Sequence, residues 1–227
     1  MQFFLDTANL DSIRHWQAFG LVDGVTTNPA LLAKEGGDPL KHLENVCELV
    51  GGPVSAQVTA TDTAGMITQG HALSKVRDNV VVKIPATANG YRAAETLVGN
   101  GIQCNITLCF QPAQAIPFAR LGAAYVSLIV GRTEDFGLNS RDEVARTRQL
   151  IDAIGSETKL LVASIRNPTH LTEAIIGGAD VLTVPPTTWD LVHQNPLSAT
   201  GQGDFANAWS SLPDASRESY ERLATAA

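Results

Sequence analysis

Eight short runs of apolar and β-branched residues recur along the chain, and each is followed by a stretch of helical character. A strand that alternates with a helix implies parallel strands joined by right-handed crossovers. Eight such units within about 190 residues favour a closed (β/α)8 TIM barrel of the α/β class. The expected strands are Gln2–Leu5, Leu21–Val25, Val54–Val58, Asn79–Ile84, Gly101–Thr107, Ala124–Val130, Lys159–Ala163 and Asp180–Val184.

The segments between these runs place apolar residues on one helical face. In the first segment, Ile13, Trp16 and Phe19 share a face. The expected helices are Asn9–Trp16, Pro39–Leu49, Thr63–Val76, Tyr91–Val98, Gln111–Arg120, Arg141–Ile154, Pro168–Ile176 and Thr187–Val192.

An open, doubly wound sheet is the alternative architecture. It is disfavoured because the turn after the first strand, Asp6-Thr7-Ala8-Asn9, is not glycine-rich. We predict a catalytic barrel over residues 1–195 and a C-terminal helical extension over 196–227 that docks on a neighbouring subunit. In the extension, a short helix is expected around Phe205–Ser211, and Pro213–Ala227 is expected to be a helix or a loose tail.

The composition argues against several classes of protein. With 16 Lys and Arg against 23 Asp and Glu, the formal net charge is −7, which disfavours binding to a nucleic-acid backbone. The sequence has neither a secretory leader nor an apolar span of about 18 residues, so we expect a soluble cytoplasmic protein without membrane contact. Cys47, Cys104 and Cys109 lack the spacing of a metal site and are expected to be buried free thiols. No metal or other cofactor is predicted.

In a barrel, the side chains at the carboxyl ends of the strands face the active site. Asp6 ends the first strand and either points into the barrel mouth or, like Thr7, caps the next helix. After the second strand, Thr26-Thr27-Asn28 precedes Pro29, which can open a helix; these residues either cap that helix or bind substrate hydroxyls. Gln57 lies between apolar neighbours, so its amide must satisfy the backbone or face a polar lumen.

The fourth strand ends in Val81-Val82-Lys83-Ile84-Pro85. Strand alternation puts Lys83 on the face of Val81, opposite Val82 and Ile84. If that face is the lumen, burial lowers the pKa of the lysine and frees a nucleophilic amine. The alternative is a strand-end lysine whose ammonium reaches out to water.

The later strands end in further polar side chains. Asn105 and Thr107 are two residues apart and share one strand face. Arg132, Ser164 and Arg166 follow the sixth and seventh strands, where barrels commonly hold phosphates. Two arginine forks and a hydroxyl suit a phosphate, although each arginine alone could form an ion pair at the rim.

Six strand-end motifs together resemble the transaldolase and fructose-6-phosphate aldolase family, and specifically its small-subunit members. The resemblance extends from Phe3 to about Trp209. The motifs are Leu5-Asp6-Thr7-Ala8-Asn9, Gly24-Val25-Thr26-Thr27-Asn28-Pro29, Val81-Val82-Lys83-Ile84-Pro85, Asn105-Ile106-Thr107, Val130-Gly131-Arg132 and Ala163-Ser164-Ile165-Arg166.

This resemblance implies a Schiff base on Lys83 and a role for each of the other strand-end residues. Asp6 and Asn28 would bind the hydroxyls of a dihydroxyacetone unit, with Thr27 and Asn105 beside them, and Thr107 would position a catalytic water. The phosphate would be held by Arg132, Ser164 and Arg166. The implied activity is transfer of dihydroxyacetone between a ketose phosphate and an aldose phosphate in carbohydrate metabolism, such as the pentose phosphate pathway. The implied assembly is a homo-oligomer, a pentamer or a decamer.

Two positions depart from the family pattern. Gln57 stands where the transaldolases have Glu, and an amide cannot take up a proton. Ile129 stands where the aldolases have Tyr and the transaldolases have Phe, so the acceptor side of the pocket is expected to be enlarged or reshaped. The base is then expected to be Asp6 or a water held by Gln57 and Thr107. A fructose-6-phosphate aldolase and a non-catalytic barrel that binds sugar phosphates are the alternative functions.

Overall fold

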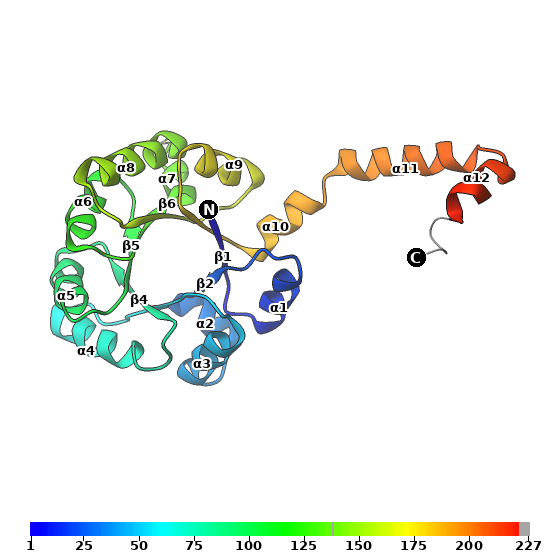
Figure 1. Cartoon of the computed structure of the whole chain (residues 1–227). Coiled ribbons are helices and arrows are strands. Elements are labelled where there is room, and N and C mark those ends of the chain that lie inside the picture. Colours follow the sequence, from blue (N-terminus) through cyan, green and yellow to red (C-terminus); the bar gives the residue numbers. More distant parts are fainter. Residues whose placement is uncertain (138, 223–227) are drawn as a thin grey trace. The chain divides into compact units, whose positions relative to one another are not determined.

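The computed structural model describes residues 1–137 and 139–222 of the chain. Eight parallel strands pair in chain order, and β8 pairs with β1, which closes the barrel. The helices that connect the strands lie around the outside of the barrel (Figure 1). This arrangement confirms the predicted (β/α)8 barrel and excludes the open sheet. The strands are β1 (Gln2–Asp6), β2 (Gly24–Thr26), β3 (Val54–Gln57), β4 (Val80–Pro85), β5 (Cys104–Cys109), β6 (Tyr125–Ile129), β7 (Lys159–Ala163) and β8 (Val181–Val184).

The helices follow the strands in the alternating order that the sequence predicted. Two helices, rather than one, separate β2 from β3 and also β6 from β7. The helices are α1 (Leu10–Ala18), α2 (Pro29–Glu35), α3 (Pro39–Leu49), α4 (Thr63–Leu73), α5 (Ala88–Gly99), α6 (Pro112–Leu121), α7 (Val130–Asp135), α8 (Ser140–Ile154), α9 (Pro168–Ile176), α10 (Pro186–His193), α11 (Pro196–Ser210) and α12 (Asp214–Glu221).

Strands β2 and β5 begin later than the sequence predicted, because the preceding helices end in an extra turn. The amide of Leu21 donates to the carbonyl of Trp16, and the amide of Ile102 donates to the carbonyl of Leu97. In both turns a glycine has a left-handed backbone, with φ of 70° at Gly20 and 78° at Gly101. These bonds close off the helix ends, so the apolar residues that follow belong to the loop and not to the strand.

Several helices differ from the predicted ones. The short helix expected at Phe205–Ser211 is α11, which begins at Pro196, where the side chain of Asn195 caps the amide of Leu197. Its Gly201 and Gly203 lowered the helical signal without preventing the helix. Helix α7 was not predicted, because it is only six residues long and its first residue, Val130, continues the apolar run of β6. Helix α2 begins at Pro29, as the Asn-Pro pair suggested.

The barrel separates two apolar cores. Val82 and Ile84 pack outward, in the cluster between the strands and the helices. Val81 packs inside the barrel with Phe4 and Tyr125, whose ring centroids are 5.7 Å apart. Gly24 makes room for this interior core, because a Cβ there would lie 2.6 Å from the Phe4 ring. Lys83 shares the strand face of Val81, so the prediction that its face is the lumen is confirmed.

The chain divides into two compact units, Met1–Trp189 and the remainder from Asp190. The first contains the whole barrel. The second contains the end of α10 with α11 and α12, and its Trp209 and Tyr220 rings pack edge to face with centroids 5.1 Å apart. Across the described residues, every helix is too short or too polar to cross a membrane.

Candidate active site

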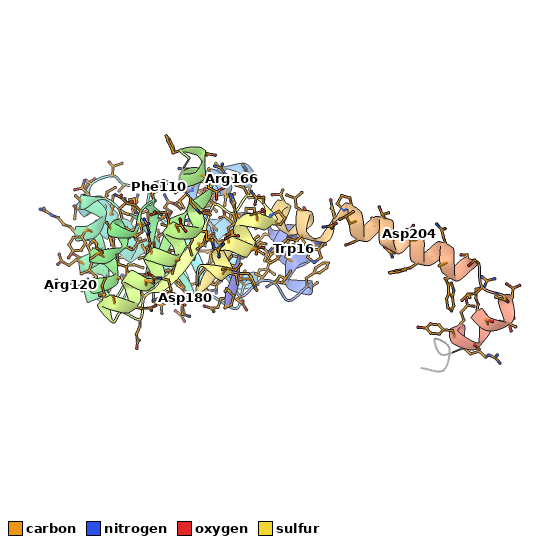
Figure 2. The ribbon with its side chains drawn as sticks, turned by 90° about the horizontal axis from the view of Figure 1, so that it is seen from above. Trp16, Phe110, Arg120, Arg166, Asp180 and Asp204 are labelled. Atoms are coloured by element: carbon orange, nitrogen blue, oxygen red, sulfur yellow. The ribbon has the colours of Figure 1, made fainter. Side chains whose placement is uncertain are left out.

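A cavity of about 450 Å³ opens at the carboxyl ends of the strands. Figure 2 shows Phe110 and Arg166, which follow β5 and β7, at one end of the barrel and Asp180, which precedes β8, at the other. The cavity brings together eight of the predicted site residues from seven strands and their loops. These are Asp6, Asn28, Gln57, Lys83, Thr107, Ile129, Arg132 and Ser164. Thr27, Asn105 and Arg166 lie next to lining residues but are not part of the cavity wall.

Lys83 lies at the bottom of this cavity, with 7% of its surface exposed. Its Nζ donates a hydrogen bond to the backbone carbonyl of Thr27, 3.1 Å away, instead of reaching out to bulk water. Burial lowers the pKa of the Lys83 ammonium, and the carboxylate of Asp6 opposes that shift. A lysine amine in this setting is more often neutral, and therefore nucleophilic, than one on the surface.

Asp6 lines the same cavity from the end of β1. Its Oδ1 accepts a hydrogen bond of 2.8 Å from the Thr26 hydroxyl, which also lies 2.6 Å from the hydroxyl of Thr183. Burial raises the pKa of the Asp6 carboxyl, while Lys83 and the Thr26 hydrogen bond oppose the rise. The alternative that Asp6 caps the next helix is wrong, since the cap of α1 is the side chain of Asn9.

Thr27 and Asn28 are both held by the local backbone. The Thr27 hydroxyl donates to the carbonyl of Ser55, 2.8 Å away, so its side chain ties β2 to β3. The Asn28 Oδ1 accepts from the amide of Leu31 and caps α2, while the residue also lines the cavity. The capping interpretation is therefore confirmed for Asn28, and it leaves the amide nitrogen of this side chain for a ligand.

Asn105 is fully buried beside Lys83, its register partner across β4 and β5. Its Nδ2 donates to Ser55 Oγ at 2.9 Å, and its Oδ1 accepts from Ser127 Oγ at 2.6 Å. The three side chains form a polar chain across the lumen. Ser127, but not Asn105, lines the cavity, and its hydroxyl is fully buried in this polar chain.

Gln57, Thr107 and Ile129 form the wall around the lysine. Gln57 pairs in register with Lys83, so the two side chains leave neighbouring strands on the same lumen face. Thr107 and Ile129 are 4% and 7% exposed. These three residues give the cavity that contains Lys83 an amide, a hydroxyl and a branched aliphatic side chain. Of the described residues that line the cavity, Asp6 alone carries a carboxylate.

Of the three residues expected to bind a phosphate, two line the cavity and one does not. Arg132 and Ser164 line the cavity, whereas the Arg166 guanidinium forms a two-pronged ion pair with Asp135. Gly131 lies between them and has no room for a side chain, because a Cβ there would be 2.8 Å from Ser164 Oγ and 2.7 Å from Arg166 Nε. In this structure Arg166 adopts the rim ion pair that the sequence left open as an alternative.

Two residues of the cavity wall have a left-handed backbone that disfavours non-glycine residues. Leu108 has φ of 59° at an irregularity in the pairing of β5 with β6, and Ser164 has φ of 64° after β7. Outliers of this kind cluster at functional sites, where the surrounding structure holds them. At these two positions the backbone geometry places Thr107 and Ser164 against the cavity.

Sequence reasoning missed two polar residues that line the cavity, Ser127 and Thr183. The two-residue period of the strands provided the signal, since Ser127 precedes Ile129 by two and Thr183 follows Val181 by two. Both lie inside apolar runs that are typical of a buried core.

The expected free thiols are present, and burial raises the pKa of Cys104 and of Cys109 to about 12.

The sequence as a whole resembles known proteins of one family. Residues 3–224 match the family model described as transaldolase/fructose-6-phosphate aldolase. Proteins named probable transaldolase from Caulobacter sp. strain K31 and from Methanococcus maripaludis strain C5 are each 44% identical over 209 residues. These alignments cover 92% of this chain and 96% and 97% of those relatives. A probable transaldolase from Lactiplantibacillus plantarum is also 44% identical over 92% of the chain. The resemblance of the six strand-end motifs is thereby confirmed, and the chain belongs to the transaldolase/fructose-6-phosphate aldolase family of enzymes.

Proposed function

We propose that the protein is a Schiff-base transaldolase, which moves a dihydroxyacetone unit from a ketose phosphate to an aldose phosphate. One observation carries the proposal: the amine of Lys83 lies almost fully buried in a polar cavity that also contains Asp6. Burial lowers the pKa of this lysine, and a neutral amine attacks carbonyls. The names of the relatives, probable transaldolase, agree with this activity.

The reaction begins when the Lys83 amine adds to the C2 carbonyl of the ketose. Loss of water from the resulting carbinolamine gives an iminium, whose positive nitrogen accepts electrons from the C3–C4 bond. A base removes the proton of the C4 hydroxyl as that bond breaks, and an aldose leaves. The three-carbon enamine on Lys83 then attacks the aldehyde of the acceptor, and water releases the new ketose and the free amine.

We assign the proton transfers to Asp6, directly or through a water held by Gln57 and Thr107. Gln57 cannot take up a proton, because an amide has no basic site near neutral pH. Burial raises the pKa of Asp6 toward the range in which a carboxyl group both gives and takes protons. The Thr26 hydroxyl donates to Oδ1 of the Asp6 carboxylate, and the Thr183 hydroxyl is bonded to that of Thr26, so Oδ2 of Asp6 is left for proton transfer.

The remaining assignments follow the positions of the polar groups. Asp6 and Asn28, with Asn105 beside them, would bind the hydroxyls of the dihydroxyacetone unit, and Thr27 would hold the amine through its carbonyl. Arg132 and Ser164 would bind the phosphate, with Arg166 beside them. An arginine fork and a hydroxyl provide the donors that a phosphate accepts.

The test of the proposal is reduction with borohydride in the presence of fructose 6-phosphate, followed by mass mapping. We expect a reduced three-carbon or six-carbon adduct on Lys83 and none in Lys83→Met. An adduct on another lysine would refute the assignment. If no ketose gives an adduct, the result would favour a barrel that binds sugar phosphates without turnover.

Fructose-6-phosphate aldolase activity is the second candidate, and Gln57 in the cavity wall favours it. The two activities differ in the fate of the enamine, which is protonated and hydrolysed in an aldolase. Sustained release of free dihydroxyacetone without an acceptor supports the aldolase. A burst of one equivalent or less, with turnover only after an aldose is added, supports the transaldolase.

We further propose that the protein is a cytoplasmic homo-oligomer, a pentamer or a decamer. The helices of the second unit expose large apolar side chains, with Leu197 82% and Phe205 78% exposed on α11. They are eight positions apart, which places them near the same helical face. Light scattering should give a mass of five or ten chains, and Leu197→Glu with Phe205→Glu should lower it. The free thiols agree with a reducing compartment.

A further inference from the structure

The guanidinium of Arg166 is anchored by one of its edges. Its Nη1 and Nη2 donate to the two carboxylate oxygens of Asp135, at 2.6 and 2.9 Å. Because both oxygens are engaged, the pair fixes the plane of the guanidinium as well as its position. Asp135 is the last residue of α7, whereas Arg166 belongs to the loop after β7, so the pair joins the helix that carries Arg132 to the loop that carries Ser164.

The Nε atom of the same guanidinium lies near Gly131 and Ser164. A Cβ built on Gly131 would lie 2.7 Å from Arg166 Nε and 2.8 Å from Ser164 Oγ, so these two atoms flank one point above Gly131. Ser164 lines the cavity. Asp135 binds the Nη1 and Nη2 edge, which leaves the Nε–H donor outside this ion pair.

The backbone beside Arg166 is held by the same helix. The Arg166 amide donates to His170 Nδ1 at 3.3 Å, and His170 Nε2 contacts the carboxylate of Glu134. Neighbouring residues of α7 thus hold the loop in two places: Glu134 holds its backbone through His170, and Asp135 holds the Arg166 side chain. Arg166 is 46% exposed, and without its partner such a side chain samples many rotamers.

We propose that Asp135 is a positioning residue that gives the site its selectivity for phosphorylated sugars. It holds the Arg166 guanidinium with the Nε–H edge beside Ser164, ready for a phosphate oxygen. The phosphate and Asp135 then bind different edges of one guanidinium and do not compete for it. Pre-ordering the arginine lowers the entropic cost of binding. This inference rests on the proposed function, specifically on a phosphate held by Arg132, Ser164 and Arg166.

Steady-state kinetics with fructose 6-phosphate and with fructose as donors test the inference. Asp135→Asn keeps the size of the side chain but loses one acceptor and the charge. We expect the KM for fructose 6-phosphate to rise about fivefold at unchanged kcat, with both constants for fructose unaffected. The inhibition constant of inorganic phosphate, as a competitive inhibitor of the fructose reaction, should rise by a similar factor in Asp135→Asn. Asp135→Glu, which keeps the carboxylate, should recover most of the affinity.

Asp11→Asn is the matched control, because Asp11 forms an exposed ion pair with Arg14 on α1, outside the cavity wall. This control should change neither KM nor kcat for either donor. An unchanged or lower KM in Asp135→Asn, together with a raised KM in Arg166→Ala, overturns the inference and leaves the phosphate site standing. If neither variant separates the two donors, the phosphate assignment itself is wrong. Equal losses for both donors in Asp135→Asn, with a loss for fructose 6-phosphate alone in Arg166→Ala, would indicate that Asp135 has a merely structural role and would also overturn the inference.

Discussion

The Lys83 amine donates to the backbone carbonyl of Thr27, 3.1 Å away, and the side chain of that threonine is itself bonded to the carbonyl of Ser55. Three adjacent strands thereby determine where the nitrogen lies: β4 carries the lysine, β2 leads into the threonine and β3 holds it. The backbone carbonyl is a neutral partner. It orients the amine without the positive shift in pKa that a carboxylate in the same place would cause.

The trapping reaction should show the lowered pKa of Lys83. Only the neutral amine attacks a ketose, and burial lowers the pKa of the ammonium below its usual value of 10.5. The rate of borohydride-trapped adduct formation should therefore rise with pH and level off at an inflection below 10.5. Single-turnover trapping between about pH 6 and pH 11 measures it. An inflection at or above 10.5 would show that the cavity does not depress this pKa.

Asp6→Asn should move that inflection to lower pH. The Asp6 carboxylate raises the pKa of Lys83, so removal of its charge lowers the pKa further. The same substitution removes the assigned acid and base, and kcat should fall by about 10²-fold or more. Asp11→Asn, on the exposed face of α1, controls for the loss of one negative charge. A kcat close to that of the unmodified enzyme would instead assign the proton transfers to a water held by Gln57 and Thr107.

The strand-end residues could be located from the sequence because the barrel imposes two regular constraints. The two-residue strand period put Lys83 on the face of Val81, and parallel strands brought their carboxyl ends to one cavity. The partners within the cavity could not be deduced in this way. The ion pair of Arg166 with Asp135 depends on α7, a six-residue helix that follows β6 directly and has too few apolar residues to show a helical period. The left-handed backbone of Ser164 has no signature in a serine.

Ser127→Ala should destabilise the barrel by about 1–3 kcal/mol, because it leaves the buried Oδ1 of Asn105 without its hydrogen-bond donor. Denaturant unfolding at a fixed protein concentration measures the change. Thr96→Ala is the control, since the Thr96 hydroxyl bonds within exposed α5 and its loss should change stability by no more than about 0.5 kcal/mol. Equal effects of the two substitutions would mean that the polar chain through Asn105 does not stabilise the fold.

Gly131→Ala should damage the phosphate side of the site. The new Cβ would lie 2.4 Å from the backbone carbonyl of Ser164, which cannot move as easily as the end of a side chain. We expect a loss of about 1–3 kcal/mol in unfolding free energy and a raised KM for phosphorylated donors. Gly99→Ala in α5 is the control, because a Cβ added at Gly99 would have no heavy atom of the described residues within 4 Å, apart from its chain neighbours and the backbone of its own helix. This substitution should be neutral or stabilising by up to about 1 kcal/mol. If both alanines are tolerated alike, the approach of Ser164 to Gly131 is looser than described.

Ile129→Phe should narrow the range of acceptors. Ile129 is 7% exposed in the wall of the cavity, and a phenyl ring at this position would be bulkier than the isoleucine. The unmodified enzyme should therefore accept long aldoses, and the substitution should lower kcat/KM for acceptors of six to eight carbons more than for those of three or four. An acceptor panel with a fixed donor measures the ratio, and Ile129→Leu, which conserves volume, should leave it unchanged. If the unmodified enzyme already prefers three- and four-carbon acceptors, and the phenyl ring does not alter that preference, the isoleucine does not set the size of the acceptor.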